Sequence, residues 1–224
     1  LENVKNLINH DNGNTYRVIW SHLTEAGYVV REQIMNSCEY GNLPQNRERI
    51  YIVGFRDRKV YERFYFPRPI PLTIKLSDCI NMVEPVQENF YYRQGICPFY
   101  ETLALGVKHS DTLYQWRRHY VRQNQRGLCP TLTANMGTGG HNVPIVKTKF
   151  GIRKLTPREC FNFMGYPKNY KLPNLANSYL YKQAGNSVTV PVIKRIAEAM
   201  KSAIEEDEPR IERYQQLQLF PIEQ

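Results

Sequence analysis

The stretch that decides the fold is GNLPQNRERIYIVGF, residues 41–55. Its end, Ile50 to Phe55, is an apolar run with one glycine, which predicts a buried strand. Gln45, Arg47 and Arg49 stand at alternate positions directly before this run. Alternate side chains of an extended chain point to one side, so we expect one amide and two guanidinium groups to converge at the mouth of the strand. Guanidinium groups suit phosphate or carbonyl oxygens, and a pair of structural salt bridges is the alternative.

The composition describes an ordered globular protein. The 224 residues are 42% hydrophobic and 12% aromatic, enough for one or two domains with a substantial core. No apolar run approaches the roughly 20 residues of a membrane helix, and no secretory signal is present. The chain opens with Leu1 instead of Met, which indicates that something upstream has been removed. The five cysteines show neither Cys-x-x-Cys nor Cys/His spacing, which predicts a reducing compartment and no metal site.

The positive charge is concentrated in one part of the chain. The net charge is +9, and the segment from Thr112 to Arg158 contains no Asp or Glu. Its basic residues are Arg117, Arg118, Arg122, Arg126, Lys147, Lys149, Arg153, Lys154 and Arg158. Tyr114, Trp116 and Tyr120 are interleaved with them. A solvated basic face is the usual explanation, but charge mixed with aromatic rings favours a polyanion held by charge and stacking.

The first part of the chain predicts a helix followed by two paired strands. Residues 15–26 carry a helical apolar stripe, with Asn14 as a possible cap and Gly27 as a stop. Residues 28–35 are rich in Val and Ile and should form a strand antiparallel to residues 50–55. Prolines at 67, 69 and 71 predict a domain boundary, and residues 73–111 show no sustained period.

The later segments predict two more helices. Thr156-Pro157-Arg158-Glu159 is a capping box, so a short helix should run over 157–164 and stop at Gly165. Gly185-Asn186-Ser187 precedes a long helix whose apolar face is Ile193, Ile196, Ala197, Met200 and Ile204. Asn or Ser at its start is either a plain cap or part of a helix end that holds a ligand carboxylate. The glycines at 137, 139 and 140 allow close approach to a ligand, or simply a flexible hairpin.

Five motifs in order resemble the C-terminal half of DNA (cytosine-5) methyltransferases of the bacterial restriction–modification type. They are Glu2-Asn3-Val4, Gln45-x-Arg47-x-Arg49, Thr131-Leu132, Arg153 to Pro167, and Gly185-Asn186-Ser187-Val188. The resemblance implies an α/β fold, the C-terminal part of a Rossmann-like catalytic domain with a smaller, irregular β-rich target-recognition domain. We therefore expect catalytic-domain strands and helix over 1–66, the recognition domain over 67–180, a helix returning to the catalytic domain over 181–206, and a polar tail over 207–224.

The resemblance also implies the chemistry. In this family a cysteine thiolate adds to C6 of cytosine, and C5 then takes a methyl group from S-adenosyl-L-methionine. Glu2 matches the carboxyl group that assists at N3 and the exocyclic amine. Arg49 matches the donor to O2, and Arg47 would brace the catalytic loop or a phosphate. Asn186 and Ser187, with Gly185, would lie near the methionine end of the cofactor.

The expected partner is double-stranded DNA in a bacterial, nucleoid-associated cytoplasm, because the target base must be flipped out of the duplex. The predicted DNA-binding residues are Arg117, Arg118, Arg122, Arg126, Thr131, Asn135, Gly137, Thr138, Gly139, Gly140 and His141. Arginine bidentate to guanine is the commonest specific contact, so we expect a short site containing G·C pairs.

The sequence departs from the family at the nucleophile. The family's thiolate lies in a Pro-Cys-Gln motif, and this chain has no Pro-Cys pair. The glycine-rich first motif and the acidic cofactor-binding residues are also missing. We therefore expect these residues alone to be inactive, and to need an N-terminal half in the same polypeptide or in a separate subunit.

Two other functions stay open, and the tail carries a separate hypothesis. A non-catalytic DNA-binding specificity subunit would need only the basic segment, and an RNA cytosine-5 methyltransferase would use the same site residues. The tail segment Gln216-Leu217-Gln218-Leu219-Phe220 resembles peptides that bind the bacterial sliding clamp, or its leucines pack on the protein itself.

Overall fold

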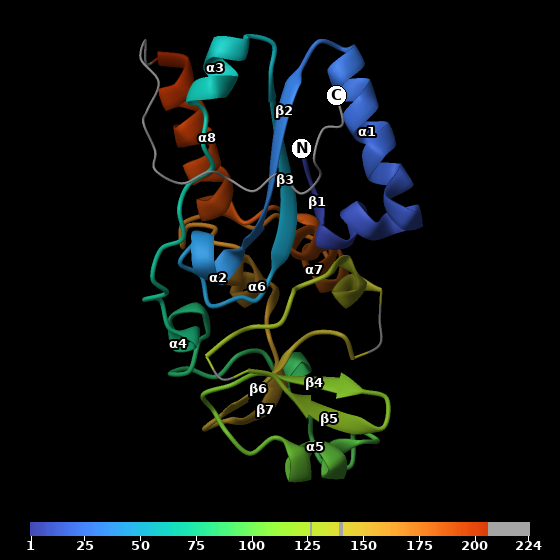
Figure 1. Ribbon diagram of the computed structural model, residues 1–224. Coiled ribbons are helices and arrows are strands. Elements are labelled where there is room, and N and C mark those ends of the chain that lie inside the picture. The colour runs from blue at the N-terminus through green and yellow to red at the C-terminus, as the bar shows by residue number, and fades with distance from the viewer. Residues whose placement is uncertain (126, 139–140, 206–224) are drawn as a thin grey trace. The chain divides into compact units, whose positions relative to one another are not determined.

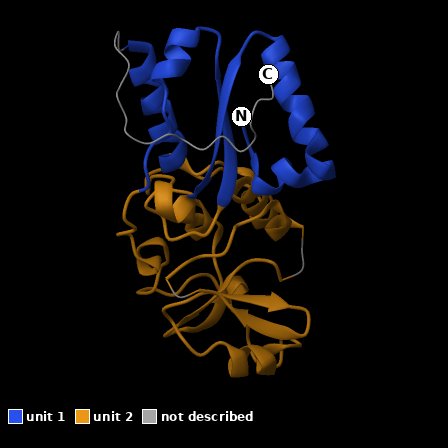
Figure 2. Ribbon diagram, viewed as in Figure 1, with its two compact units in different colours: residues 1–36, 48–69, 191–224 blue, residues 37–47, 70–190 orange. Residues whose placement is uncertain are grey.

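A computed structural model describes residues 1–125, 127–138 and 141–205. The chain divides into two compact units, coloured separately in Figure 2. Unit 1 contains residues 1–36, 48–69 and 191 onward, and unit 2 contains residues 37–47 and 70–190. The domain limits expected at 67 and 181 stay a prediction. The segment 45–49 is shared, because Gln45 and Arg47 belong to unit 2 and Arg49 belongs to unit 1.

Unit 1 is a three-stranded antiparallel sheet with helices on both faces (Figure 1). Its elements are β1 (Glu2–Val4), η1 (Lys5–Gly13), α1 (Asn14–Glu25), β2 (Val29–Asn36), β3 (Glu48–Phe55), α3 (Arg58–Arg63) and nearly all of α8 (Val190–Glu205). The strand order is β1-β3-β2, so the apolar strand β3 is central. The predicted strand pairing is confirmed, with Ile34 opposite Ile50 and Val29 opposite Phe55.

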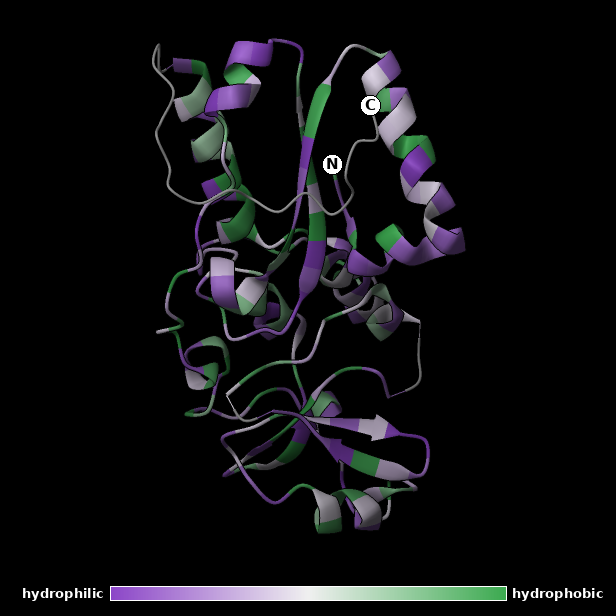
Figure 3. Ribbon diagram, in the orientation of Figure 1, coloured by the Kyte–Doolittle hydropathy of each residue, from purple (hydrophilic) through white to green (hydrophobic). Residues whose placement is uncertain are grey.

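The alternation of β3 explains its double burial. Ile50 and Ile52 pack with Leu7, Ile8, Tyr16 and Val30 in the cluster that α1 covers. Phe55 points to the other face and contacts Phe64, with ring centroids 5.3 Å apart. Hydrophobic residues accordingly colour parts of β2, β3 and α8 in Figure 3. A strand covered on both faces reads as a continuous apolar run, which is why residues 50–55 were recognisable.

The cap of the first helix differs from the prediction. Gly13, and not Asn14, is the N-cap of α1, with φ +82°. Asp11 and Asn12 also have positive φ, so the chain enters the helix through a left-handed segment that favours glycine at its end. The predicted stop is confirmed, because α1 ends at Glu25 and Gly27 follows with φ +83°.

Unit 2 contains a four-stranded antiparallel sheet of order β5-β4-β6-β7 and much irregular backbone. Its elements are α2 (Ser37–Tyr40), α4 (Leu76–Cys79), η2 (Glu88–Phe90), α5 (Tyr100–Gly106), β4 (Tyr114–Arg117), β5 (Tyr120–Gln123), η3 (Ala134–Gly137), β6 (Ile145–Thr148), β7 (Gly151–Lys154), α6 (Pro157–Phe163) and α7 (Asn177–Asn186). Residues 73–111, which had no clear period, are ordered by burial of Phe90, Leu103 and Val107.

The capping box of α6 is confirmed and belongs to a buried network. Thr156 accepts a hydrogen bond from the Glu159 backbone, and the Glu159 carboxylate accepts one from the Thr156 backbone. Glu159 also forms an ion pair with Arg153 at 2.7 Å, with 3% and 1% of the two side chains exposed. Arg153 is therefore committed to the interior and does not contribute to a basic surface.

The residues before α8 are placed differently from the prediction. Gly185 and Asn186 end α7, and α8 begins only at Val190, whose backbone N–H donates to Met164. These residues therefore do not form a helix N-terminus that could hold a carboxylate. The buried face of α8 is Val192, Ile196 and Ala203, whereas the expected Ala197 and Ile204 are exposed.

None of the described helices is long and apolar enough to cross a membrane.

Candidate functional site

Glu2 and Arg49 form an ion pair on the sheet of unit 1. β1 pairs antiparallel with β3, with Glu2 opposite Tyr51 and Val4 opposite Arg49. Glu2 and Arg49 are therefore diagonal neighbours across the two strands, within reach of long side chains. Arg49 Nε lies 3.2 Å from Glu2 Oε1, with 12% and 23% of the two side chains exposed. Arg49 Nη1 also donates to the Glu48 carbonyl at 2.8 Å.

This pair can present charge to a ligand from a partly desolvated position. Burial lowers the pKa of Arg49, and the Glu2 carboxylate opposes that shift. Arg49 Nε and Nη1 make these two contacts, and among the described residues Nη2 makes no hydrogen bond. A carboxylate and a guanidinium side by side can accept and donate hydrogen bonds to one flat polar ring. The structure thus brings together two of the predicted catalytic residues.

Gln45 and Arg47 point elsewhere, and the expectation that all three side chains converge is wrong. Gln45 is fully buried, donates to the Phe163 carbonyl at 2.7 Å, and accepts from the Leu132 N–H at 3.3 Å. Arg47 Nη1 donates to the Leu132 carbonyl at 2.7 Å. These two side chains converge on Leu132, inside unit 2, while Arg49 pairs with Glu2. Both side chains form hydrogen bonds with backbone groups of irregular segments, because buried backbone groups outside helices and sheets need other partners.

The predicted cofactor residues lie at the end of α7. The Asn186 side chain is exposed, and no hydrogen bond among the described residues uses its amide. The Ser187 hydroxyl donates to the Ala184 carbonyl at 2.9 Å. The carbonyls of Gly185 and Ser187 accept from Arg47 Nη2 at 3.2 and 2.9 Å. The exposed amide of Asn186, next to backbone that Arg47 holds in place, is suited to bind a polar group of a ligand.

Unit 2 also contains a cleft of about 550 Å³, called the polar cleft below. It brings together five of the predicted DNA-binding residues, namely Arg117, Arg122, Thr131, Asn135 and His141. Arg118, Gly137 and Thr138 are not in its described lining, which contains no Asp or Glu. Burial, followed by the nearby Lys154 charge, lowers the pKa of His141.

Two lining residues, Asn46 and Gln115, were not found by sequence reasoning. Their amides line the cleft with those of Asn124, Gln125, Asn135 and Asn142. Amide side chains offer both donors and acceptors, which is suited to base edges. Gln115 lies next to Trp116 on β4, in the segment where aromatic and basic residues are interleaved. That position in the sequence could have predicted its role in the cleft. Nothing in the sequence around Asn46 predicts such a role, because only the folded conformation of its loop places Asn46 at the cleft.

Two of the aromatic residues expected to stack on nucleic acid are used internally. Tyr114 is fully buried, and its hydroxyl accepts from the backbone N–H of His109 at 2.8 Å. Trp116 stacks on Phe99, with ring centroids 4.3 Å apart. Tyr120 remains exposed. Tyr114 therefore belongs to the core under the hairpin, whereas Trp116 is half-buried and also lines the polar cleft.

Gly137 is needed for packing. A Cβ atom at this position would lie 2.1 Å from the Ser178 carbonyl of α7. Its close approach is thus to the protein's own backbone, not to a ligand. Arg126, Gly139 and Gly140, and the tail segment 216–220, lie outside the described residues.

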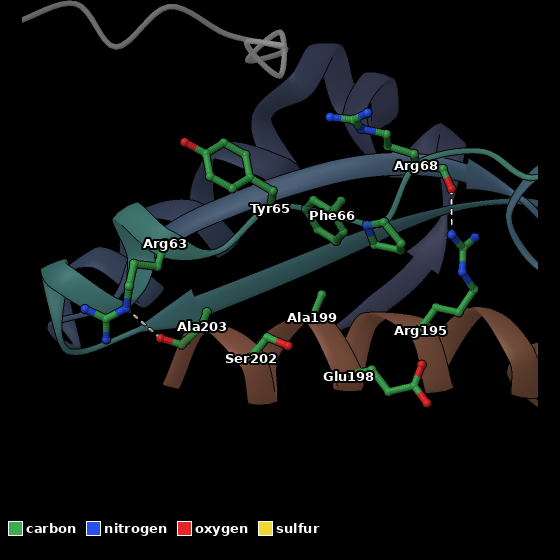
Figure 4. A pocket seen from close by; sticks show the side chains of 10 residues that line it. Arg63, Tyr65, Phe66, Arg68, Arg195, Glu198, Ala199, Ser202 and Ala203 are labelled. Carbon is green, nitrogen blue, oxygen red and sulfur yellow. Dashed lines mark hydrogen bonds between the residues drawn. The ribbon is translucent and has the colours of Figure 1, made fainter. Parts of the chain in front are cut away.

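Two smaller hollows carry none of the predicted catalytic residues. Figure 4 shows one in unit 1, of about 250 Å³, where Arg63 and Arg195 donate to the carbonyls of Ala203 and Arg68 at 2.9 and 2.7 Å. These arginines fix α8 to the end of α3 and to the segment that follows it. The other hollow, of about 420 Å³ in unit 2, shares His141 with the polar cleft and is lined by Lys154.

The cysteines of the chain are poor candidates for a nucleophile. Cys79, Cys129 and Cys160 are buried, and burial raises the pKa of each thiol, to about 12 for Cys79. A raised pKa leaves little thiolate at neutral pH. Cys38 and Cys97 are half-buried, and neither follows a proline. Within the described ranges no cluster of His, Cys, Asp or Glu could hold a metal ion.

Comparison with known proteins gives a consistent result. The family described as C-5 cytosine-specific DNA methylase matches residues 1–202. The chain is 61% identical over 198 residues to the Type II methyltransferase M.Bsp6I of Bacillus sp. (strain RFL6), covering 88% of this chain and 63% of that protein. It is 35% identical over 217 residues to the Type II methyltransferase M.HhaI of Haemophilus parahaemolyticus, covering 91% and 63%.

Solved structures show the same fold. The Entamoeba histolytica methyltransferase EhMeth superposes with a TM-score of 0.65 at 16% identity, covering 92% of this chain and 62% of that one. The S. pombe Dnmt2 methyltransferase superposes with a TM-score of 0.61 at 14% identity, covering 92% and 67%. The expected fold class is thereby confirmed. This chain spans somewhat less than two thirds of the length of the curated relatives compared above.

Proposed function

Because the chain belongs to the C-5 cytosine-specific DNA methylase family, we propose that it is the C-terminal portion of a site-specific DNA methyltransferase. That enzyme flips a cytosine out of duplex DNA and methylates its C5 atom. The observation that carries the proposal is the Glu2–Arg49 pair, with Arg49 Nε 3.2 Å from Glu2 Oε1. A purely DNA-binding subunit has no need of a partly buried carboxylate and guanidinium at one place.

The pair has the polarity that this reaction requires. Addition of a nucleophile to C6 of cytosine moves negative charge toward N3 and O2. The Glu2 carboxyl group, carrying a proton for this step, would donate to N3 and accept from the exocyclic amine, and the Arg49 guanidinium would donate to O2. Both groups are already partly desolvated and are fixed by β1 and β3, so their effect on the developing charge is strengthened.

The residues at the end of α7 fit S-adenosyl-L-methionine. The open amide of Asn186 would hydrogen-bond a polar group at the methionine end, and Ser187 still has acceptor capacity. The cofactor supplies the methyl group. Gly185 contributes by its small size, because it lets the backbone of α7 lie directly against residues 133–134.

The polar cleft would hold the DNA. Arg117 and Arg122 provide positive charge for phosphates, and the amides of Gln115, Asn124 and Asn135 can read base edges. Bacterial Type II relatives such as M.Bsp6I support a role in restriction–modification. We place the protein with the chromosome in the bacterial cytoplasm.

The thiolate would come from an N-terminal half that is not in this sequence. The chain has no Pro-Cys pair, and its buried thiols have raised pKa values. The missing half would be either part of the same polypeptide or a separate subunit.

Arg49→Ala tests the proposal in an enzyme completed with the part of M.Bsp6I that this chain lacks. We expect unchanged affinity for a cognate duplex and a loss of methyl transfer of at least 100-fold, the order expected for one lost oxyanion-type donor. Arg63→Ala, in the hollow of unit 1 that neither Glu2 nor Arg49 lines, is the matched control. If Arg49→Ala methylates at the control's rate, Glu2 and Arg49 are structural and the specificity-subunit function is favoured. A binding competition between transfer RNA and duplex DNA tests the alternative that the substrate is RNA, which stronger binding of transfer RNA would favour.

A further inference from the structure

A buried polar cluster, called the Arg47 junction below, connects three distant segments of unit 2. It consists of Ser37, Gln45, Arg47, Leu132, Gly185, Ser187 and Thr189. The Arg47 side chain is 3% exposed, and Leu132 is fully buried. The Arg47 backbone is also held, because its carbonyl accepts from the Ser37 N–H at 3.0 Å. The hydroxyls of Ser37 and Thr189 lie 2.8 Å apart.

The Arg47 guanidinium bonds to both ligand-facing segments. Nη1 donates to Leu132, which adjoins Thr131 and Thr133 in the lining of the polar cleft. Nη2 donates to Gly185 and Ser187, which flank the exposed amide of Asn186. A planar guanidinium can span three carbonyls in fixed directions, whereas the point charge of lysine cannot. One side chain thus sets the backbone on both sides.

The same two segments also touch directly. A Cβ atom at Gly185 would lie 2.1 Å from the carbonyl carbon of Thr133 and 2.3 Å from the nitrogen of Ala134. Their backbones are therefore in contact. Movement of residues 131–134 displaces residues 185–187, and breaks a hydrogen bond to Arg47 unless both segments move together.

We propose that Arg47 is a positioning residue that couples DNA recognition to cofactor binding. This inference rests on the proposed function, since it needs DNA in the polar cleft and the cofactor beside Asn186. DNA that fixes residues 131–133 fixes the carbonyl of Leu132, which holds Arg47 and through it the carbonyls of Gly185 and Ser187. The cofactor then meets a preorganised site, and by linkage the cofactor tightens DNA binding by the same factor.

The test is the ratio of cofactor dissociation constants without and with a cognate duplex. It is measured by calorimetry with S-adenosylhomocysteine, on the enzyme completed with the missing part of M.Bsp6I. We expect a wild-type ratio of roughly 5 to 100, in the range usual for coupled sites. Arg47→Lys keeps the charge but not the three-carbonyl geometry, and should bring the ratio close to one.

A control separates coupling from loss of stability. Thr156→Ala removes the α6 cap, which lies outside the junction. This variant should destabilise the fold and retain most of the ratio. A wild-type ratio kept in Arg47→Lys, or a ratio of one in a wild-type enzyme that methylates DNA, would overturn the coupling and leave the proposed function intact. Absence of both cofactor binding and methylation in the completed wild type would overturn both.

Discussion

Arg47 and Arg49 have different partners, although a single residue separates them. Arg49 lies within β3 and pairs with Glu2 on the neighbouring strand. Arg47 precedes the strand and gives its hydrogen bonds to backbone carbonyls. An ion pair with a partly exposed carboxylate leaves the guanidinium able to meet a ligand. A guanidinium enclosed by carbonyls can only act through the backbone it holds.

The substitution Gly185→Ala tests how closely α7 packs on residues 133–134. Gly185→Ala would place a methyl group 2.1 Å from backbone that cannot rotate away. We expect a loss of about 2–4 kcal/mol in the free energy of unfolding, typical of severe overpacking. Urea unfolding followed by circular dichroism measures it. Asn186→Ala, at the exposed neighbouring position, should change stability by less than about 0.5 kcal/mol, and equal effects of the two variants would contradict this packing.

His141 should make DNA binding depend on pH. Burial and the Lys154 charge lower its pKa below the ordinary 6.5, so the imidazole is neutral at pH 7 and gains a proton only below pH 6.5. Its charge in the polar cleft then attracts phosphate, so affinity for duplex DNA should rise as the pH falls from 7.5 to 5.5. The fold disfavours this charge, so the stability of the free protein should fall over the same window.

The measurement is fluorescence anisotropy of a labelled duplex across this pH range. His141→Gln keeps a polar side chain without a titrating group, and should lose the pH-dependent part of the affinity. A pH profile identical to that of the wild type would show that other groups cause it.

At the scale of elements, the hairpin of β4 and β5 supplies one wall of the polar cleft. Tyr114 is packed under it, and the half-buried Trp116 stacks on Phe99 and lines the cleft together with Gln115, Arg117 and Arg122. Short strands of this kind have little stability alone. These aromatic residues therefore fix the hairpin, and its polar side chains are held at defined positions toward the cleft.

Arg122→Ala should weaken binding through the loss of one phosphate contact. The slope of log affinity against log salt concentration should fall in magnitude by about 0.9, the value for one phosphate. Salt titrations of duplex binding measure this slope. Lys201→Ala, on α8 in unit 1, removes an exposed lysine that does not line the cleft, and should leave the slope unchanged. An unchanged slope in Arg122→Ala would mean that Arg122 does not contact the backbone.

At the scale of the molecule, the residues proposed for DNA binding and those proposed for catalysis belong to different units. The residues of the polar cleft belong to unit 2, and the Glu2–Arg49 pair belongs to unit 1. Unit 1 has β1 as an edge strand within the described sheet. An edge strand with unpaired backbone groups is suited to accept another strand, and we expect the N-terminal half to provide it.

The chain by itself should therefore bind duplex DNA without methylating it. Gel-shift assays and transfer of labelled methyl groups measure the two properties on the same preparation. Addition of the missing part of M.Bsp6I, fused or as a separate chain, should restore transfer, and the same part with its Pro-Cys cysteine changed to Ala should not. Methyl transfer by the chain alone at an ordinary rate would overturn this expectation.

The sequence by itself determined the elements whose signals are local. Residues 50–55 read as a buried strand because both faces of β3 are covered, and Thr156 to Glu159 specify a helix start by neighbouring hydrogen bonds. The ordered motifs also identified the family and placed Glu2 and Arg49 in one site. These features need only the period of a strand, the geometry of a cap, or residue types at fixed spacing.

Only the tertiary structure decided which polar side chains stay open to solvent and which are used inside the protein. Three arginines that look equivalent in the sequence have different partners. Arg47 donates to three backbone carbonyls, Arg49 pairs with Glu2, and Arg153 pairs with the buried Glu159. Gly137 and Tyr114 likewise serve internal packing. The partners of Arg47 lie 85 to 140 residues away along the chain. The physical reason is that a buried charge takes whichever distant backbone or side-chain oxygens the fold leaves unsatisfied, and no local pattern encodes them.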